Sequence, residues 1–442
     1  MKTLILTLNL AIFFSILYLS PLSPLLAKGL AIFVFVAVLW VTEVFHVSIT
    51  SLVVPVLAVL LGVFDVAEAL LNFANPIIFL FLGGFALAAA MHKHHLDQLI
   101  ANKLIALANG NLLPSSFLIF GLTAFLSMWI SNTATIAMMM PLVLGLLSRL
   151  DYRAHKSTYL YFLLGTAYAG SIGGMGTLIG SPPNAIAGAA IGVGFMEWMR
   201  FGIPMVLLSL PLMVGVLYLF YRPQREAKLA LSKAAFTVTR GGKKTALIFF
   251  CTVLGWLFSQ PLSEALAIDG NFDALVAILA VVALGGSRVV TWREISESTE
   301  WGVLILFGGG LTLSAILTVT GASLWLAEGF LAIVHGAPTI IFMLFTIAFV
   351  VFLTELASNT ASAALLIPIF MSLAVSMELS PMVVAAVIAL AASCAFMLPI
   401  ATPPNAIVYG TGYVPQKDMM RVGLVLNIVL IALITALGSL FI

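Results

Sequence analysis

Charged residues are scarce in this sequence. Aspartate, glutamate, lysine and arginine make up 8% of its 442 residues, whereas soluble globular domains contain roughly 25%. Apolar residues make up 62%, against roughly 45–50% in such domains. So few charged groups cannot cover the surface of a water-soluble chain of this size, which excludes that class. We predict an all-α polytopic membrane protein, and at about 20 apolar residues per crossing the length allows roughly ten to twelve helices.

Cysteine is nearly absent, and so are the sequence motifs of enzymes. Cys251 and Cys394 lie in apolar runs, so we expect them to pack between helices and not to form a disulfide. The sequence contains no His-Glu-x-x-His zinc motif and no Gly-x-Ser-x-Gly nucleophile motif. The histidines within 92–95 flank a lysine and are interpreted as a solvated loop. We predict that the protein is not an enzyme and has no nucleic-acid partner.

Basic residues indicate the orientation in the membrane. The segment 222–244 contains seven lysines and arginines against one acid, so the positive-inside rule makes it a cytoplasmic linker. The next connection, 259–273, contains acids and no base, and it is placed outside. Alternation from this pair predicts a cytoplasmic N-terminus, an external C-terminus and eleven crossings. Lys28 and Arg200 are the two bases that violate the pattern.

Two sequence patterns occur twice. Ser-Asn-Thr at 131–133 and again at 358–360 is followed eight residues later by proline, and the sequence Pro-Pro-Asn-Ala-Ile occurs at 182–186 and at 403–407. A weaker pair of Gly-Gly patterns at 81–84 and 306–309 precedes them. Three ordered pairs at nearly one offset indicate an internal duplication. Because the charges place the first Ser-Asn-Thr between cytoplasmic flanks and the second between external ones, we predict inverted repeats, which form transport sites near the midplane.

The segments around each Ser-Asn-Thr are too short to cross a membrane singly. Each arm of the first copy has roughly 16 apolar residues, or about 24 Å of helix, against a hydrocarbon core of about 30 Å. We predict two re-entrant hairpins with tips at 131–133 and 358–360, and two spans broken at 180–184 and 401–405, where proline removes backbone donors. Such breaks are tolerated only where protein buries them or where they line a cavity, so the four should converge.

These features divide the chain into predicted parts. The parts are scaffold helices at 1–71, a first inverted repeat at 72–221, the cytoplasmic linker at 222–244, scaffold helices of the second half at 245–299, and a second inverted repeat with the last helix at 300–442.

The interrupted helices predict what the protein binds. Backbone carbonyls and Asn, Ser and Thr oxygens suit Na⁺, while helix N-termini suit a carboxylate. Ser-Asn-Thr is also an ordinary helix cap, but two copies, each followed by Pro-Pro-Asn, favour a binding site. All lysines and arginines are placed in loops or at span ends, so a buried dianion would lack a fixed countercharge. For an anionic substrate, this favours coupling to cations.

Two acids lie inside apolar runs. Glu43 and Glu355 are candidates for proton relays or cation ligands. Each follows a threonine, Thr42 or Thr354, and the interpretation we favour is that it holds a helix junction together. A passive channel is the rival to a transporter, and occluding hairpins argue against an open pore.

The paired Ser-Asn-Thr tips, the paired Pro-Pro-Asn breaks, and Trp40-x-Thr42-Glu43 with Pro55 resemble the divalent anion–sodium symporter family, in particular its bacterial INDY dicarboxylate transporters. The resemblance covers essentially the whole chain. It implies a homodimer in the lipid of the inner membrane, in which a transport domain moves as an elevator against a scaffold. It further implies import of succinate, fumarate or malate with several Na⁺. The alternative is a transporter of the same fold that carries sulfate or citrate or is coupled to protons.

The resemblance also implies roles for individual residues. The first sodium site would use Ser127, Ser131, Asn132 and Gly180. The second would use Thr354, Ala357, Asn359 and Ala401. The substrate carboxylates would contact Asn132, Thr133, Ser181, Asn359, Thr360 and Thr402, with Pro403 alongside. Because a serine at 181 corresponds to a threonine at 402, the two halves need not hold their carboxylates equally.

Overall fold

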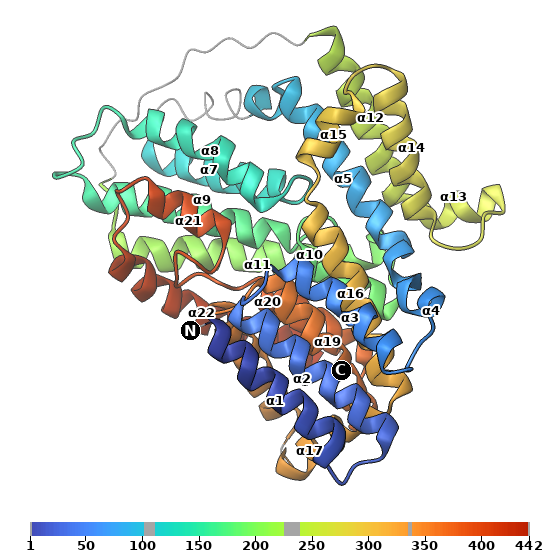
Figure 1. Ribbon diagram of the computed structural model, residues 1–442. Coiled ribbons are helices and arrows are strands. Elements are labelled where there is room, and N and C mark those ends of the chain that lie inside the picture. The colour runs from blue at the N-terminus through green and yellow to red at the C-terminus, as the bar shows by residue number, and fades with distance from the viewer. Residues whose placement is uncertain (1, 101–110, 225–238, 335–337, 441–442) are drawn as a thin grey trace.

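The computed structural model describes residues 2–100, 111–224, 239–334 and 338–440, and the elements formed by these residues are helices (Figure 1). The first half contains α1 (Lys2–Leu19), α2 (Pro24–Thr42), α3 (Val47–Leu60), α4 (Val66–Leu71), the 3-10 helix η1 (Asn72–Ala74), α5 (Pro76–Lys93), α7 (Leu112–Ser127), α8 (Asn132–Leu147), α9 (Lys156–Gly174), α10 (Pro182–Ile191) and α11 (Phe195–Tyr221). The second half contains α12 (Arg240–Leu257), α13 (Ser259–Leu266), α14 (Phe272–Gly286), α15 (Trp292–Ser298), α16 (Trp301–Val319), α17 (Ala322–Val334), α18 (Thr339–Thr354), α19 (Asn359–Ser376), α20 (Pro381–Ala392), α21 (Pro403–Gly410) and α22 (Gln416–Leu440).

The helices are long and apolar enough for a polytopic membrane protein. Among the described residues, seven helices meet the length and hydropathy of a membrane span, or eight if the bent pair α12–α13 counts as one. Starting from these eight, α19 is subtracted because it is one arm of a hairpin. Four crossings are then added, namely α3, α14 and the interrupted pairs α9–α10 and α20–α21, which gives the predicted number of eleven. The orientation of the termini stays a prediction, and most of the predicted linker, 225–238, lies outside the described residues.

Helices of the two halves pack against each other. In Figure 1, α12 and α14 lie beside α5, whereas α7 and α8 lie beside α9. The Gly-Gly patterns permit two close approaches between the halves: a Cβ at Gly83 in α5 would lie 2.6 Å from the Cβ of Ala277 in α14, and a Cβ at Gly309 in α16 would lie 2.6 Å from that of Ser51 in α3. The repeated Gly-Gly pattern therefore lies where α5 crosses α14 and where α16 crosses α3, two crossings between the halves.

Both hairpins and both broken spans are present. α7 and α8 are joined through 128–131, and α18 and α19 through 355–358, so Asn132 and Asn359 are the first residues of the returning helices. The turns therefore begin a few residues before the predicted tips. α9 ends at Gly174 and α10 begins at Pro182, while α20 ends at Ala392 and α21 begins at 403. Proline at the first position of each new helix fits, because a helix has no partner for that N–H.

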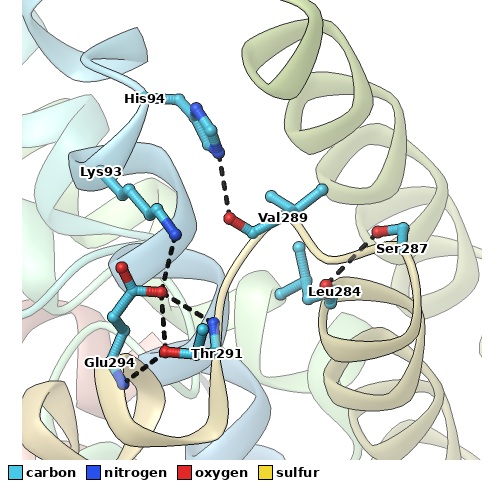
Figure 2. A network of polar contacts seen from close by, with 7 residues as sticks. All are labelled: Lys93, His94, Leu284, Ser287, Val289, Thr291 and Glu294. Atoms are coloured by element: carbon cyan, nitrogen blue, oxygen red, sulfur yellow. Dashed lines mark hydrogen bonds and ion pairs between the residues drawn. The ribbon is translucent and has the colours of Figure 1, made fainter.

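A polar junction connects the end of α5 to the start of α15 (Figure 2). Lys93 Nζ lies 2.7 Å from Glu294 Oε2, which also accepts from Thr291 N at 2.7 Å. These donors, Lys93 first, lower the pKa of Glu294 from 4.5 to about 2. His94 Nε2 lies 3.2 Å from the carbonyl of Val289. His94 is half-buried and bonded within the junction, whereas His92 and His95 are exposed, as expected for a solvated histidine segment.

Candidate functional site

Four interrupted helices meet at one cavity of about 390 Å³. Both hairpin turns and both broken spans contribute to its wall, although half of the chain separates the two copies. From these interruptions the cavity is lined by Ser131, Asn132, Thr133, Ile179, Gly180, Ser181, Pro182, Pro183, Leu356, Ala357, Ser358, Asn359, Thr360, Ile400, Ala401, Thr402, Pro403 and Pro404. The structure therefore brings the four interruptions together, as the sequence predicts.

Each of the four helices that follow an interruption begins at this cavity. α8, α10, α19 and α21 all contribute their first two residues to the wall. Helix N-termini carry partial positive charge, so their convergence favours an anion. The first residues of α10 and α21 are prolines without an N–H group, so these two helices contribute their dipoles and the hydroxyls of Ser181 and Thr402, whereas α8 and α19 also carry N–H groups.

The asparagine of each Pro-Pro-Asn holds its unwound segment in place. Asn184 Nδ2 donates to the carbonyls of Gly174 at 2.8 Å and Thr177 at 2.7 Å. Asn405 Nδ2 donates to the carbonyls of Ala395 and Leu398, both at 3.0 Å. These contacts occupy equivalent positions of the two repeats. The repeated Asn is therefore a brace inside the protein, and the residues that precede it face the cavity.

Oxygen atoms surround the side-chain amide of Asn132. Ser127 Oγ lies 2.5 Å from the amide, and the carbonyls of Gly170 and Gly180 lie 3.3 Å from it. When its NH2 group faces these atoms, its two hydrogens are shared among the three oxygens. When Oδ1 faces them, it completes a set of four oxygens, which is the donor chemistry that a hard cation requires.

Two glycines allow the backbone to approach this amide. A Cβ at Gly174 would lie 2.5 Å from Asn132 Oδ1, and a Cβ at Gly180 would lie 2.5 Å from the carbonyl of Gly174. Both distances are shorter than non-bonded carbon and oxygen atoms tolerate, so a side chain at either position would displace the wall of oxygens. The glycine cluster at 173–176 therefore serves close packing beside the broken span.

The second tip repeats the arrangement with different residues. Thr354 Oγ1 lies 2.5 Å from Asn359 Oδ1 and 2.9 Å from the carbonyl of Ala392. Ala395 and Ala401 stand where the first half has Gly174 and Gly180. The second group of oxygens is therefore built around alanines.

The structure places every residue predicted for the site at or beside the cavity. All seven residues predicted for the substrate line it, as do all the predicted sodium residues except two. Those two, Ser127 and Thr354, are fully buried behind the tips and contact the amides of Asn132 and Asn359. Ser127 and Thr354 therefore lie on the inner side of the tips, whereas the other six residues predicted for sodium line the same cavity as those predicted for the substrate.

The helix caps of the two broken spans differ. Thr402 Oγ1 accepts from the N–H of Asn405 at 3.3 Å and so caps α21. Ser181 makes no such cap, and its hydroxyl lies 3.3 Å from that of Ser393. The hydroxyl of Ser181 is therefore not used within its own helix.

Glu355 joins three helical segments. Its carboxylate accepts from the backbone N–H groups of residues 396, 397 and 398 at 2.7, 2.8 and 3.1 Å, and from Asn427 Nδ2 at 2.7 Å. It thus ties the second hairpin turn to the loop between α20 and α21 and to α22. This geometry supports the interpretation that Glu355 holds a junction.

Several residues of the cavity were not recognised in the sequence. They come from the end of α2, from α5 and from the start of α16, and they are Glu43, Phe81, Phe85, Glu300 and Val303. For Glu43 the sequence predicts a proton relay, a cation ligand or, as favoured, a helix junction, but not a place at this cavity. Glu43 caps α2 with a left-handed φ of 48°. A signal for Glu300 existed, since it is an acid immediately before an apolar span. A second cavity of about 580 Å³ shares Phe85, Ser131, Thr133 and Glu300 and reaches His92 and Asp97 at the end of α5.

Apolar helices that unwind around a shared polar cavity define a membrane transporter. The chain belongs to the citrate transporter family, CitMHS, whose family model matches residues 37–389 and 274–442. The protein is therefore a transporter and not an enzyme.

Individual relatives agree with this assignment. A Haemophilus influenzae protein described as an uncharacterized transporter is 47% identical over 99% of this chain and 96% of its own length. The sodium-dependent dicarboxylate transporter SdcS of Staphylococcus saprophyticus is 34% identical over 92% of this chain and 84% of its own. The YdaH transporter of Alcanivorax borkumensis has a similar fold, with a TM-score of 0.57 at 15% identity over 93% of this chain and 98% of that one.

Proposed function

We propose that the protein is a sodium-coupled symporter that imports C4 dicarboxylates such as succinate, fumarate and malate. The observation that carries this proposal is the cavity, which receives four helix N-termini while the residues described as lining it include no Lys, Arg or His. Helix N-termini supply only fractional positive charge, so a dianion needs further countercharge, which co-bound cations provide. The similarity to SdcS, which is named as a sodium-dependent dicarboxylate transporter, supports the same function.

Sodium binds on the inner side of the two tips in this proposal. The first site uses Ser127, Ser131, Asn132 and Gly180, and the oxygens around the Asn132 amide support it. The second site uses Thr354, Ala357, Asn359 and Ala401, and the short approach of Thr354 Oγ1 to Asn359 Oδ1 supports it. Sodium at each site turns the asparagine oxygen toward the cation, which leaves the amide NH2 group free for the substrate.

The substrate binds on the cavity side of the same residues. One carboxylate contacts Asn132, Thr133 and Ser181, and the other contacts Asn359, Thr360 and Thr402, with Pro403 alongside. All of them line the cavity, which supports a ligand that spans the two repeats. Because each asparagine contacts both ligands, a bound cation prepares the anion site at the same tip.

Transport in this proposal is an elevator movement within a homodimer in the inner membrane. The two repeats, 72–221 and 300–442, supply the moving hairpins and broken spans. The remaining helices, in 1–71 and 245–299, supply the fixed scaffold, and the linker 222–244 lies in the cytoplasm. The cavity wall supports such a division, because all of its described residues except Glu43 come from the two repeats.

A substrate panel in proteoliposomes tests this proposal. Purified protein is reconstituted, and uptake of succinate, fumarate, malate, citrate and sulfate is measured with an inward Na⁺ gradient, with an inward proton gradient and with neither. We expect the C4 dicarboxylates to accumulate under the Na⁺ gradient only. Accumulation of citrate or sulfate without succinate, or accumulation driven by protons, would replace the proposed substrate or the proposed ion.

A further inference from the structure

Glu300 lies where the two cavities meet. It is the N-cap of α16, and its side chain lines both the 390 Å³ cavity at the tips and the 580 Å³ cavity that extends toward His92 and Asp97. The predicted orientation places the second cavity on the cytoplasmic side, because the basic end of α5 is there. Glu300 therefore borders both the proposed substrate site and its path to the cytoplasm.

Glu300 lies beside the first hairpin tip. It lines the same two cavities as Ser131, and Ser131 Oγ accepts from the N–H of Ala134 at 3.3 Å. A hydroxyl has one hydrogen and two acceptor positions. With one acceptor position on Ala134, Ser131 keeps its hydrogen for the Glu300 carboxylate and one lone pair for a cation at the tip.

The charge of Glu300 has no fixed compensation in the cavity. The described lining residues include two carboxylates, Glu43 and Glu300, and no basic side chain. No ion pair joins Glu300 to a base within the described part of the chain. A carboxylate in this position attracts a cation to the tip and repels a dianion from the empty cavity.

We propose that Glu300 makes anion binding at this site conditional on sodium: it strengthens cation binding at the first tip and opposes the anion while that tip is empty. This inference rests on the proposed function and adds a residue to it. Glu300 acts through Ser131 and through its charge, so it is a positioning residue. After release of sodium into the cytoplasm, the same charge favours departure of the anion.

Removal of the Glu300 charge should weaken Na⁺ binding and strengthen succinate binding in the absence of Na⁺. Glu300→Gln keeps the size of the side chain and an oxygen that accepts from Ser131, but it lacks the charge. The interaction between two unit charges about 8 Å apart, at an effective dielectric constant of about 30, corresponds to about a tenfold change in a ligand's binding constant. We therefore expect the Na⁺ concentration for half-maximal succinate binding to rise about tenfold, and succinate binding without Na⁺ to increase by about tenfold or more. A folding defect would weaken both.

The experiment uses full-length protein in lipid nanodiscs with radiolabelled succinate. Na⁺ is titrated at fixed succinate, succinate is titrated with choline in place of Na⁺, and the melting temperature is recorded against Na⁺ without succinate. Glu297→Gln is the matched control, since Glu297 is 63% exposed and pairs with Arg293 at 2.8 Å outside the cavity. It should behave as wild type, and Glu300→Asp, which keeps the charge, should retain most of the sodium dependence.

The outcomes separate this inference from the proposed function. If wild type binds succinate equally with and without Na⁺, the proposed coupling is wrong. If wild type binds no succinate, the proposed substrate is wrong, and the effect of Na⁺ on the melting temperature still tests Glu300. If wild type depends on Na⁺ and Glu300→Gln has the same Na⁺ requirement and the same sodium-free binding, the role of Glu300 is overturned while the proposed function stands. If Glu300→Gln does not fold, Glu300→Ala is measured in its place, and a Na⁺ requirement equal to that of wild type overturns the role of Glu300.

Discussion

At the scale of single residues, the two tip asparagines differ from other buried asparagines of the chain. Asn132 and Asn359 each place one side-chain amide between a group of oxygens and an open cavity. Asn9 instead is buried in α1, with Nδ2 donating to the carbonyl of Phe35 at 2.9 Å. Such an amide can contact a cation among the oxygens on one side and an anion in the cavity on the other, and coupled binding of the two ligands requires this.

Replacement of either tip asparagine by alanine should abolish coupled uptake. Each of Asn132→Ala and Asn359→Ala removes an oxygen from a proposed cation site and a donor from a proposed anion contact. Charge-assisted hydrogen bonds contribute roughly 1.5–3 kcal/mol, so we expect a loss of about tenfold to a hundredfold in affinity for each ligand. Initial rates of uptake in proteoliposomes measure this, with Asn9→Ala as the control for loss of a buried asparagine. Normal uptake by a folded variant would remove that tip from the site.

The tip threonines should have a narrower role. Thr133→Ala and Thr360→Ala each remove one hydroxyl that faces the cavity, without changing the proposed cation oxygens. We expect the succinate concentration for half-maximal uptake to rise by about tenfold or more for each, since one hydrogen bond to a charged partner is lost. The Na⁺ requirement at saturating succinate should be unchanged, and a large change in it would contradict the separation of anion and cation sides.

At the scale of elements, an asparagine stabilises the unwound segment of each broken span, but the second segment has more hydrogen bonds than the first. Asn184 and Asn405 each bond two carbonyls of the unwound segment. The second segment is held in addition by Glu355, which accepts three of its N–H groups. The first segment has no equivalent carboxylate, because Met128 stands where the second half has Glu355.

The alanine variants of the two brace asparagines should therefore differ. Asn184→Ala removes two buried hydrogen bonds; the carbonyl of Thr177 keeps the N–H of Gly180 at 3.3 Å, but that of Gly174 loses its side-chain donor. We expect the free energy of unfolding to fall by about 2–4 kcal/mol. Asn405→Ala should cost less, because Glu355 continues to hold its segment. Thermal unfolding of both variants in detergent, without ligands, measures the difference. A larger loss in Asn405→Ala would contradict the stronger bracing of the second span.

The junction of α5 and α15 should weaken in acid. Because the folded-state pKa of Glu294 is lowered to about 2, its ionisation stabilises the junction above pH 4.5, and this stabilisation is lost as the pH falls from 4.5 toward 2. The side chains of Lys93 and Glu294 are 37% and 38% exposed, so the effect should be at most about 1 kcal/mol. The melting temperatures of wild type and Glu294→Gln, compared from pH 7 to pH 3, should converge below pH 4.5. A constant difference would contradict this role.

The sequence predicts the interrupted elements well because their signals are local. Ser-Asn-Thr begins a helix and Pro-Pro-Asn restarts one, and the repetition shows that both patterns matter. The partners of those elements are not local. The bonds from Glu355 to residues 396–398, and the meeting of Ser131 and Glu300 at one cavity, depend on how distant helices pack. A single acid before an apolar span carries no pattern that would identify its partner in advance.

At the scale of the whole molecule, duplication explains why one cavity has two similar walls. Each half supplies a hairpin tip and a broken span, so the site exists only where the halves meet. The cavity receives partial positive charge from helix N-termini, carries acids from the uninterrupted helices, and lacks a basic side chain among its described residues. Such a site suits an anion only together with cations.

The most direct test of that claim is the initial rate of succinate uptake into proteoliposomes at equal ionic strength, with external Na⁺ replaced stepwise by K⁺. The account predicts a saturable rate that falls to background when all Na⁺ is replaced, and accumulation above the external concentration while an inward Na⁺ gradient lasts. Undiminished uptake with K⁺ alone would contradict it, because the cavity would then hold a dianion without the sodium that is proposed to balance its charge.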